Sequence, residues 1–150
     1  MKILTVFALL FSTSLYAEEV VSSYTCTHED NDFVRMQIHK FLADEGFNII
    51  EASDGLTALG SMKGSISLAI VDIRMEPIDG FEFVKSIRAK DYKTPVIFVT
   101  GDQNSDILNE ANKLGVSAVL KKPVEKDRLV KMAARAISQF KRTESRAKDF

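Results

Sequence analysis

The sequence is poor in the residues that build disulfides, zinc sites and flavin-stacking walls. Its 150 residues include one cysteine, two histidines and no tryptophan. Cys26 has no second cysteine to pair with, and His28 and His39 do not provide the spacings typical of zinc sites. We expect Cys26 to be a small buried hydrophobic residue and His28 a side chain at a strand end. These absences argue against a disulfide scaffold and a structural zinc site.

The sequence also lacks an excess of charge of either sign. Its 20 Lys and Arg residues nearly balance 21 Asp and Glu residues, which gives a formal net charge of -1. A chain with this balance has no overall basic field that would attract a polyanion, so we expect no nucleic-acid partner. The 27% of charged residues argues against a multi-span membrane protein, while 45% hydrophobic residues can supply the core of one domain.

Only the N-terminus carries a long apolar run. Residues 1–17 place Lys2 before an apolar stretch over 3–15 and Ala17 at the end, a pattern typical of a secretory signal peptide. The run is short for a membrane span, and Leu15 is not the small residue preferred before a cleavage site. An apolar N-terminal helix, or a start that does not belong to the domain, is the alternative. We expect an extension over residues 1–23, one domain over 24–140 and a polar tail over 141–150.

Helical and strand-like segments alternate along the rest of the chain. Apolar spacing predicts helices over 33–45, 54–63, 80–90, 102–115 and 125–140, and apolar runs predict strands over 47–52, 66–72, 94–100 and 117–121. The helix over 102–115 has Asp102 or Ser105 as its expected cap. Residues 24–28 are a weaker candidate for a first strand. Apolar strands between helices predict an α/β fold, with a parallel sheet covered on both faces.

Polar residues stand at the ends of several predicted strands. Glu29 and Asp30 follow the first strand, Asp72 ends the third, Thr100 ends the fourth and Lys122 follows the fifth. Since the carboxyl ends of parallel strands meet at one edge of the sheet, where ligands bind, we expect these side chains to converge. The sequence therefore predicts a site with three carboxylates, a hydroxyl and an ammonium group.

This set of groups suits phosphoryl transfer. Carboxylates that lie close together repel unless a divalent cation joins them, and oxygen ligands of this kind suit Mg²⁺. Asp72 is central and could accept a phosphoryl group as an aspartyl-phosphate. Lys122 would neutralise the transferred oxygens, and the Thr100 hydroxyl would donate a hydrogen bond to one of them.

Taken together, these motifs resemble those of a response-regulator receiver domain, of the kind found in single-domain chemotaxis regulators. The resemblance covers about residues 24–140 and consists of "EDND" with Glu29 and Asp30, "IVDIRMEPIDG" with Asp72, "VIFVTG" with Thr100, and "LKKP" with Lys122. It implies a flavodoxin-like three-layer sandwich with a five-stranded parallel sheet in the order 2-1-3-4-5.

The resemblance also implies roles in metal binding. Asp30 and Asp72 would ligate Mg²⁺ directly, the backbone carbonyl of Arg74 would be a third protein ligand, and Glu29 would act largely through water. By the same resemblance Thr100 and Lys122 would contact the phosphoryl group.

The remaining implied features concern the loops around the acceptor. The resemblance implies a cis bond between Lys122 and Pro123, and Asp79 and Gly80 would shape the loop that follows Asp72. The sequence departs from the family pattern at residues 24–28, which read "YTCTH" instead of an aliphatic strand, and at Val119, where many members carry an aromatic switch residue.

We therefore expect a single-domain response regulator of the cytoplasm, phosphorylated on Asp72 by a histidine kinase or phosphotransfer protein and signalling to a protein target. It would not be an enzyme in the usual sense, although it would catalyse its own phosphorylation and dephosphorylation. One alternative is a pseudo-receiver that binds partners without phosphate; another is export, from the signal-like residues 1–17. A small hydrolase or flavin carrier is less compatible, because Arg74 stands where a second general acid would be needed and tryptophan is absent.

Overall fold

The computed structural model describes residues 19–23, 29–63, 66–102 and 104–148, with side chains from residue 33 onward. The signal-like residues 1–17, together with Cys26 and His28, lie outside the described residues. Among the helices that are described, none is long and apolar enough to cross a bilayer.

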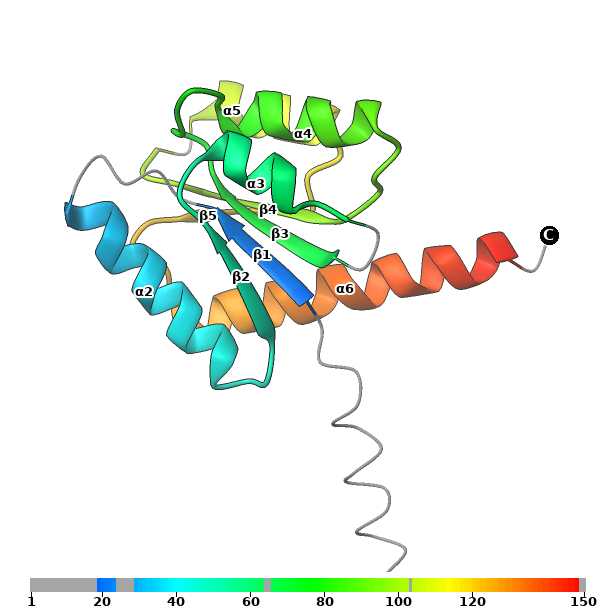
Figure 1. Ribbon diagram of the computed structural model, residues 1–150, viewed down its shortest axis with the longest axis horizontal. Coiled ribbons are helices and arrows are strands. Elements are labelled where there is room, and N and C mark those ends of the chain that lie inside the picture. Colours follow the sequence, from blue (N-terminus) through cyan, green and yellow to red (C-terminus); the bar gives the residue numbers. More distant parts are fainter. Residues whose placement is uncertain (1–18, 24–28, 64–65, 103, 149–150) are drawn as a thin grey trace, which may run out of the picture.

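Strands and helices alternate along the described chain (Figure 1). Their order is β1 (Glu19–Ser23), α2 (Glu29–Ala43), β2 (Asn48–Ala52), α3 (Gly55–Ser61), β3 (Ile66–Asp72), α4 (Gly80–Ala89), β4 (Val96–Thr100), α5 (Ser105–Lys113), β5 (Ala118–Lys121) and α6 (Lys126–Lys148). Within the described residues the strands form a five-stranded sheet in the order β2-β1-β3-β4-β5. All neighbouring strands run parallel, so their carboxyl ends share one edge.

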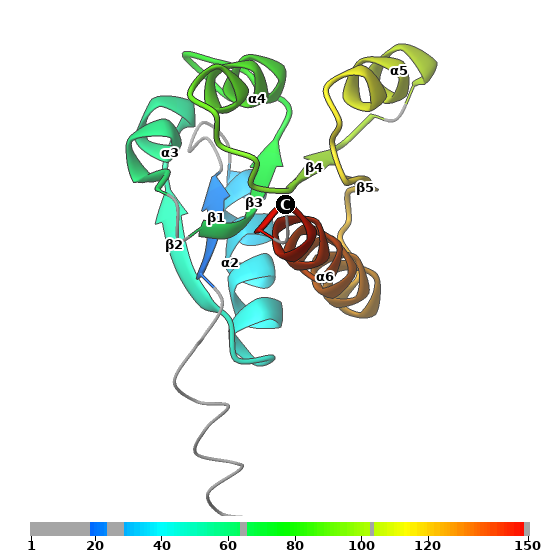
Figure 2. The same cartoon turned by 90° about the vertical axis from the view of Figure 1, so that its right-hand side faces the viewer.

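The sheet separates two apolar cores. Alternate residues of β3 point to opposite faces, so that Leu68 and Ile70 belong to one core while Ala69 and Val71 belong to the other. Helices α2 and α6 cover the first face, and α3, α4 and α5 cover the second (Figure 2). The predicted α/β fold, flavodoxin-like with helices on both faces of a parallel sheet, is confirmed.

The first strand lies earlier than the sequence suggested. Residues 19–23, "EVVSS", form β1 and pair with both β2 and β3, whereas residues 24–28 were the expected strand and lie outside the described part. Val20 and Val21 are β-branched and favour a strand more than the polar run that follows. The sheet thus already includes Glu19, which lies before the domain start expected at residue 24.

The last helix and one helix cap also differ from expectation. Helix α6 continues to Lys148, although a polar tail was expected from residue 141. Residues 141–148 contain neither glycine nor proline and consist largely of residues that tolerate a helix, so their polarity did not end it. Helix α5 is capped by Asn104, whose side chain accepts a hydrogen bond from the Ile107 N–H, and not by Asp102 or Ser105.

Candidate functional site

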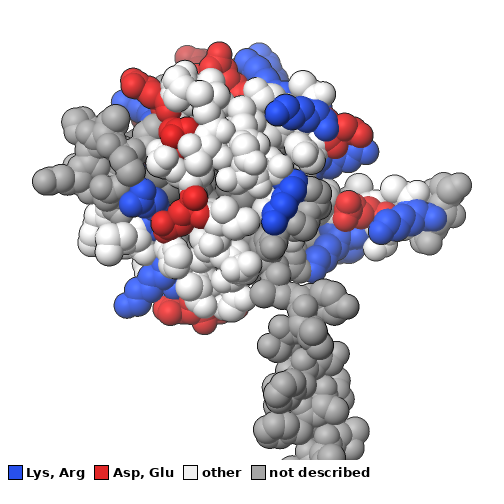
Figure 3. All heavy atoms as spheres, viewed as in Figure 1, with Lys and Arg blue, Asp and Glu red and all other residues white. Residues whose placement is uncertain are grey.

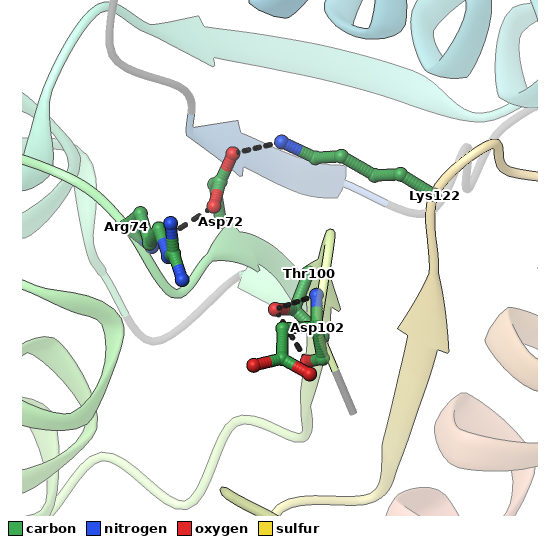
Figure 4. A network of polar contacts seen from close by, with 5 residues as sticks. All are labelled: Asp72, Arg74, Thr100, Asp102 and Lys122. Atoms are coloured by element: carbon green, nitrogen blue, oxygen red, sulfur yellow. Dashed lines mark hydrogen bonds and ion pairs between the residues drawn. The ribbon is translucent and has the colours of Figure 1, made fainter. Parts of the chain in front are cut away.

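Three of the residues predicted for the site lie at the carboxyl edge of the sheet. Asp72 ends β3, Thr100 ends β4, and Lys122 directly follows β5 (Figure 4). Asp72 is 2% exposed and Thr100 is 1% exposed. Strands β3 and β4 pair in register next to this edge, and so do β4 and β5. The parallel sheet thus assembles an acid, a hydroxyl and an amine from three separate segments.

The Asp72 carboxylate has a polar partner at each oxygen. Lys122 Nζ donates to Oδ2 at 2.5 Å, and the backbone N–H of Arg74 donates to Oδ1 at 2.9 Å. A buried carboxylate is costly unless it is paired and hydrogen-bonded. These two contacts compensate the charge and fix the orientation of the carboxylate at the end of β3.

The Thr100 hydroxyl is held by the loop that follows β4. Its Oγ1 donates to the backbone carbonyl of Asp102 at 2.8 Å and accepts from the Asp102 N–H at 3.1 Å (Figure 4). The Asp102 carboxylate in turn accepts a hydrogen bond of 3.3 Å from Asn104, the residue that caps α5. A chain of polar contacts therefore runs from Thr100 to the first turn of α5.

The loop after the acceptor passes very close to β3. The N–H of Gly80 donates to the carbonyl of Ile73 at 2.9 Å. A Cβ atom at Gly80 would lie 3.0 Å from Ile73 Cα and 3.2 Å from the carbonyl oxygen of Asp72. Asp79 caps α4 by accepting from the Glu82 N–H at 2.8 Å. Both residues named from the sequence for this loop therefore have a definite structural part in it.

The predicted acidic pair opens α2. Glu29 and Asp30 are the first two residues of that helix, and their side chains lie outside the described part of the structure. Their roles as metal ligands stay predictions.

The described residues supply only part of a metal site. No group of three or more His, Cys, Asp or Glu side chains that could hold a metal ion occurs among them. Of the ligands predicted from the sequence, the described part includes the Asp72 carboxylate and the backbone of Arg74, and carboxylate and carbonyl oxygens of this kind suit Mg²⁺. The cation would need further oxygen ligands, for which the sequence offers Glu29 and Asp30.

Several features around the site were not foreseen from the sequence. The Lys122-Pro123 peptide bond is cis as expected, but the Glu76-Pro77 bond is cis as well. A pocket of about 290 Å³ lies beside Lys122 and is lined in part by Lys121 and Arg128. The Asn104 cap could have been found from its place directly before the periodic helix, whereas the pocket depends on tertiary packing that no local pattern reports.

Comparison with known proteins agrees with this geometry. The family model of the response regulator receiver domain matches residues 26–134. The transcriptional regulatory protein FixJ of Bradyrhizobium diazoefficiens is 32% identical over 112 residues, which cover 74% of this chain and 55% of FixJ. The transcriptional regulatory protein PdtaR of Mycobacterium tuberculosis is 28% identical over 127 residues, which cover 83% of this chain and 62% of PdtaR. The chain thus spans little more than half the length of these two relatives.

Solved structures show the same architecture. The chemotaxis protein CheY4 of Vibrio cholerae matches with a TM-score of 0.70 at 27% identity, covering 80% of this chain and 98% of CheY4. A CheY-like receiver domain protein of Methanospirillum hungatei matches with a TM-score of 0.74 at 17% identity, covering 85% of this chain and 98% of that one, and shows the fold alone. From the match over residues 26–134, this chain belongs to the response regulator receiver domain family.

Proposed function

We propose that the chain is an Mg²⁺-dependent phosphoacceptor switch of a two-component system, with Asp72 as the residue that is phosphorylated. The observation that carries this proposal is the buried Asp72 carboxylate, which Lys122 contacts at 2.5 Å at the carboxyl edge of the sheet. A carboxylate held in one orientation beside an ammonium group suits attack on phosphorus. Receiver domains are signalling domains and not conventional enzymes, so the phosphorylated state itself would be the output.

In the proposed reaction an oxygen of Asp72 forms a bond to phosphorus while the bond from phosphorus to the donor nitrogen of a phosphohistidine breaks. The histidine nitrogen leaves with the electron pair and recovers a proton from solvent. Lys122 balances the negative charge of the transferred oxygens, and the hydroxyl of Thr100 can turn to donate to one of them. Mg²⁺, when bound, supplies further neutralisation of the phosphoryl oxygens. Asp72, the carbonyl of Arg74, Asp30 and, through water, Glu29 would hold it.

The proposed partners are a histidine kinase or a phosphotransfer protein as donor and a protein target downstream. Because Val119 occupies the place of an aromatic switch residue, we expect the signal to travel through the segment between Thr100 and α5. The contacts of Thr100 with Asp102, and of Asp102 with Asn104, support this route. We assign the protein to the cytoplasm as part of the proposal, since its phosphodonors depend on ATP. Isolation of a processed form from the periplasm would overturn that assignment.

Intact-mass measurement after incubation with Mg²⁺ and acetyl phosphate tests the proposal. The wild type is expected to gain one labile phosphoryl group, and Asp72→Asn, which keeps the shape of the side chain, is expected to gain none. A parallel incubation with EDTA tests the requirement for the metal and should abolish the adduct. A folded wild type that gains no mass at saturating Mg²⁺ would support the alternative of a pseudo-receiver that works without phosphate.

A further inference from the structure

The near-neutral charge of the whole chain conceals an uneven distribution. The formal net charge is -1, yet the sequence of α6 contains eight Lys and Arg residues and only two Asp and Glu residues. The C-terminal part of this helix extends away from the sheet (Figures 1 and 2), and every side chain from Lys141 to Lys148 is exposed. Much of the positive charge of the protein is therefore concentrated on one projecting element.

Five of these cations form a single stripe along the outer side of α6. With about 100° between successive residues of a helix, the positions of all five fall within about 60° of one another. We call this set the cation stripe; it consists of Arg128, Lys131, Arg135, Arg142 and Arg146, all of them exposed. From the first to the last it extends about 27 Å at 1.5 Å per residue. Figure 3 shows both basic and acidic side chains on the projecting part of the helix.

The cation stripe is not balanced by acidic neighbours. In the part of the chain that the structure describes, none of its five members forms an ion pair with a carboxylate. Glu144 lies on the opposite side of the helix, and Asp127 borders the stripe only in the first turn. Lys131 and Arg135 are four residues apart, and a like-charge pair at this spacing destabilises a helix. The helix dipole favours cations in the last turn of α6, as at Arg146. It does not explain the other members of the stripe, which lie closer to the start of the helix.

We propose that the cation stripe binds the phosphodiester backbone of a nucleic acid. Four of its five members are arginines, whose planar guanidinium groups match phosphate oxygens in pairs. Ser138 borders the stripe between Arg135 and Arg142 and adds a hydroxyl group of the kind that contacts phosphates. The stripe contains no aromatic side chain on which a base could stack, so the binding is independent of sequence.

Two other classes of anionic partner fit the stripe less well. A helix that lies on a membrane needs an apolar face to insert, and the apolar face of α6, with Leu129, Ala133 and Ile137, packs against the sheet. A protein interface usually has an apolar centre, which the stripe lacks. The expectation of no nucleic-acid partner depended on net charge, whereas binding to a polyanion depends on where the charges lie.

Fluorescence anisotropy of the full-length, unphosphorylated protein with short labelled DNA and RNA tests the proposal. The wild type is expected to bind with a dissociation constant of about 10⁻⁴ M or tighter at physiological salt, and to weaken steeply as salt rises. The double variant Arg142→Gln, Arg146→Gln should reduce the slope of log K against log salt by about 1.4 on a single strand, since each lost contact removes about 0.7. Single strands and duplexes of each nucleic acid, run in parallel, show which backbone the stripe prefers.

A matched control removes the same charge from the same two turns of the helix. Lys141→Gln, Lys148→Gln alters positions that lie outside the cation stripe, so its salt slope should stay near that of the wild type. Circular dichroism would verify that both variants keep the helix. Absence of binding by the wild type at low salt, or equal losses in the two double variants, would overturn the proposal. So would binding to an acidic polypeptide without binding to any oligonucleotide. None of these results depends on whether Asp72 accepts phosphate.

Discussion

The Nζ atom of Lys122 lies 2.5 Å from Oδ2 of Asp72, although 50 residues separate the two in the sequence. The contact joins the end of β3 to the segment after β5 and pairs the charge of a carboxylate that is 2% exposed. The same two side chains that we propose for phosphoryl transfer therefore also contribute to the stability of the resting protein.

Replacement of Lys122 by methionine should destabilise the protein. The variant keeps most of the side-chain volume but leaves the buried Asp72 carboxylate without its cation. We expect the free energy of unfolding to fall by about 3 kcal/mol, the lower end of the range for breaking a buried pair, because the Lys122 side chain is 21% exposed. Urea denaturation of the wild type and the variant in the presence of EDTA measures this difference in the free energy of unfolding.

The double variant Asp72→Asn, Lys122→Met is the control for this effect. It removes both charges, so it should recover a large part of the stability that Lys122→Met loses. If the double variant were as unstable as the sum of the two single variants, the ion pair would not be the cause.

Gly80→Ala should disturb the end of β3. Its new Cβ would lie 3.0 Å from Ile73 Cα and 3.3 Å from Cε1 of Phe98. Since backbone atoms cannot yield as a flexible side chain does, we expect a loss of about 1–3 kcal/mol, typical of overpacking. Gly60→Ala in α3 is the matched control, because a Cβ there meets nothing within 4 Å. Thermal unfolding should show the control unchanged or stabilised, since alanine favours a helix.

Arg74→Ala should shorten the lifetime of the proposed aspartyl-phosphate. Arg74 is an exposed residue two positions after Asp72, and we expect its side chain to flank the path of the attacking water. Removing it should admit water more readily and raise the dephosphorylation rate several-fold. The rate can be followed by loss of the mass adduct after removal of the phosphodonor, with Lys85→Ala as a surface control on α4. An unchanged rate in Arg74→Ala would contradict this role.

The cap of α3 should make a small part of the stability depend on pH. The Asp54 carboxylate accepts hydrogen bonds from the N–H and from the hydroxyl of Thr57, and both lower the pKa of Asp54 below 3.8. The bond from the N–H has the larger effect. A carboxyl group whose pKa is lower in the folded protein stabilises it above the unfolded value, and this contribution is lost as the pH falls through the folded value.

Asp54→Ser tests this contribution, because serine is also a good cap but does not titrate. Melting temperatures of wild type and variant should be similar near neutral pH. Below about pH 4, near the ordinary pKa of an aspartate, the wild type should lose stability relative to the variant. A difference that stays constant from neutral to acid pH would show that the Asp54 charge does not matter.

Most of the architecture could be predicted from the pattern of apolar residues. The strand over 66–72 has the predicted bounds, because "ISLAIVD" is an apolar run, broken only by Ser67, that ends in an acid. The position of β1 could not be predicted in this way. Residues 19–23 and 24–28 both have strand propensity, and the sequence alone does not show that residues 19–23 pair with β2 and β3.

The site was partly predictable for a similar reason. Asp72, Thr100 and Lys122 could be placed at one edge because each ends or follows a parallel strand. The present partners of Thr100 could not be foreseen, because they depend on the path of the loop through Asp102. The end of α6 could not be predicted from polarity, because the polar residues from 141 to 148 are compatible with a helix.

The hydroxyl of Thr100 has a single proton, and in the resting protein the carbonyl of Asp102 accepts it. A phosphoryl oxygen on Asp72 would compete with that carbonyl for the same proton. If the phosphoryl oxygen accepts the hydrogen bond instead, the Asp102 carbonyl loses its donor and the start of α5 loses a restraint. The resting hydrogen bond thus sets a threshold, because only an acceptor stronger than a neutral carbonyl, such as a phosphoryl group with its formal charge, can displace it.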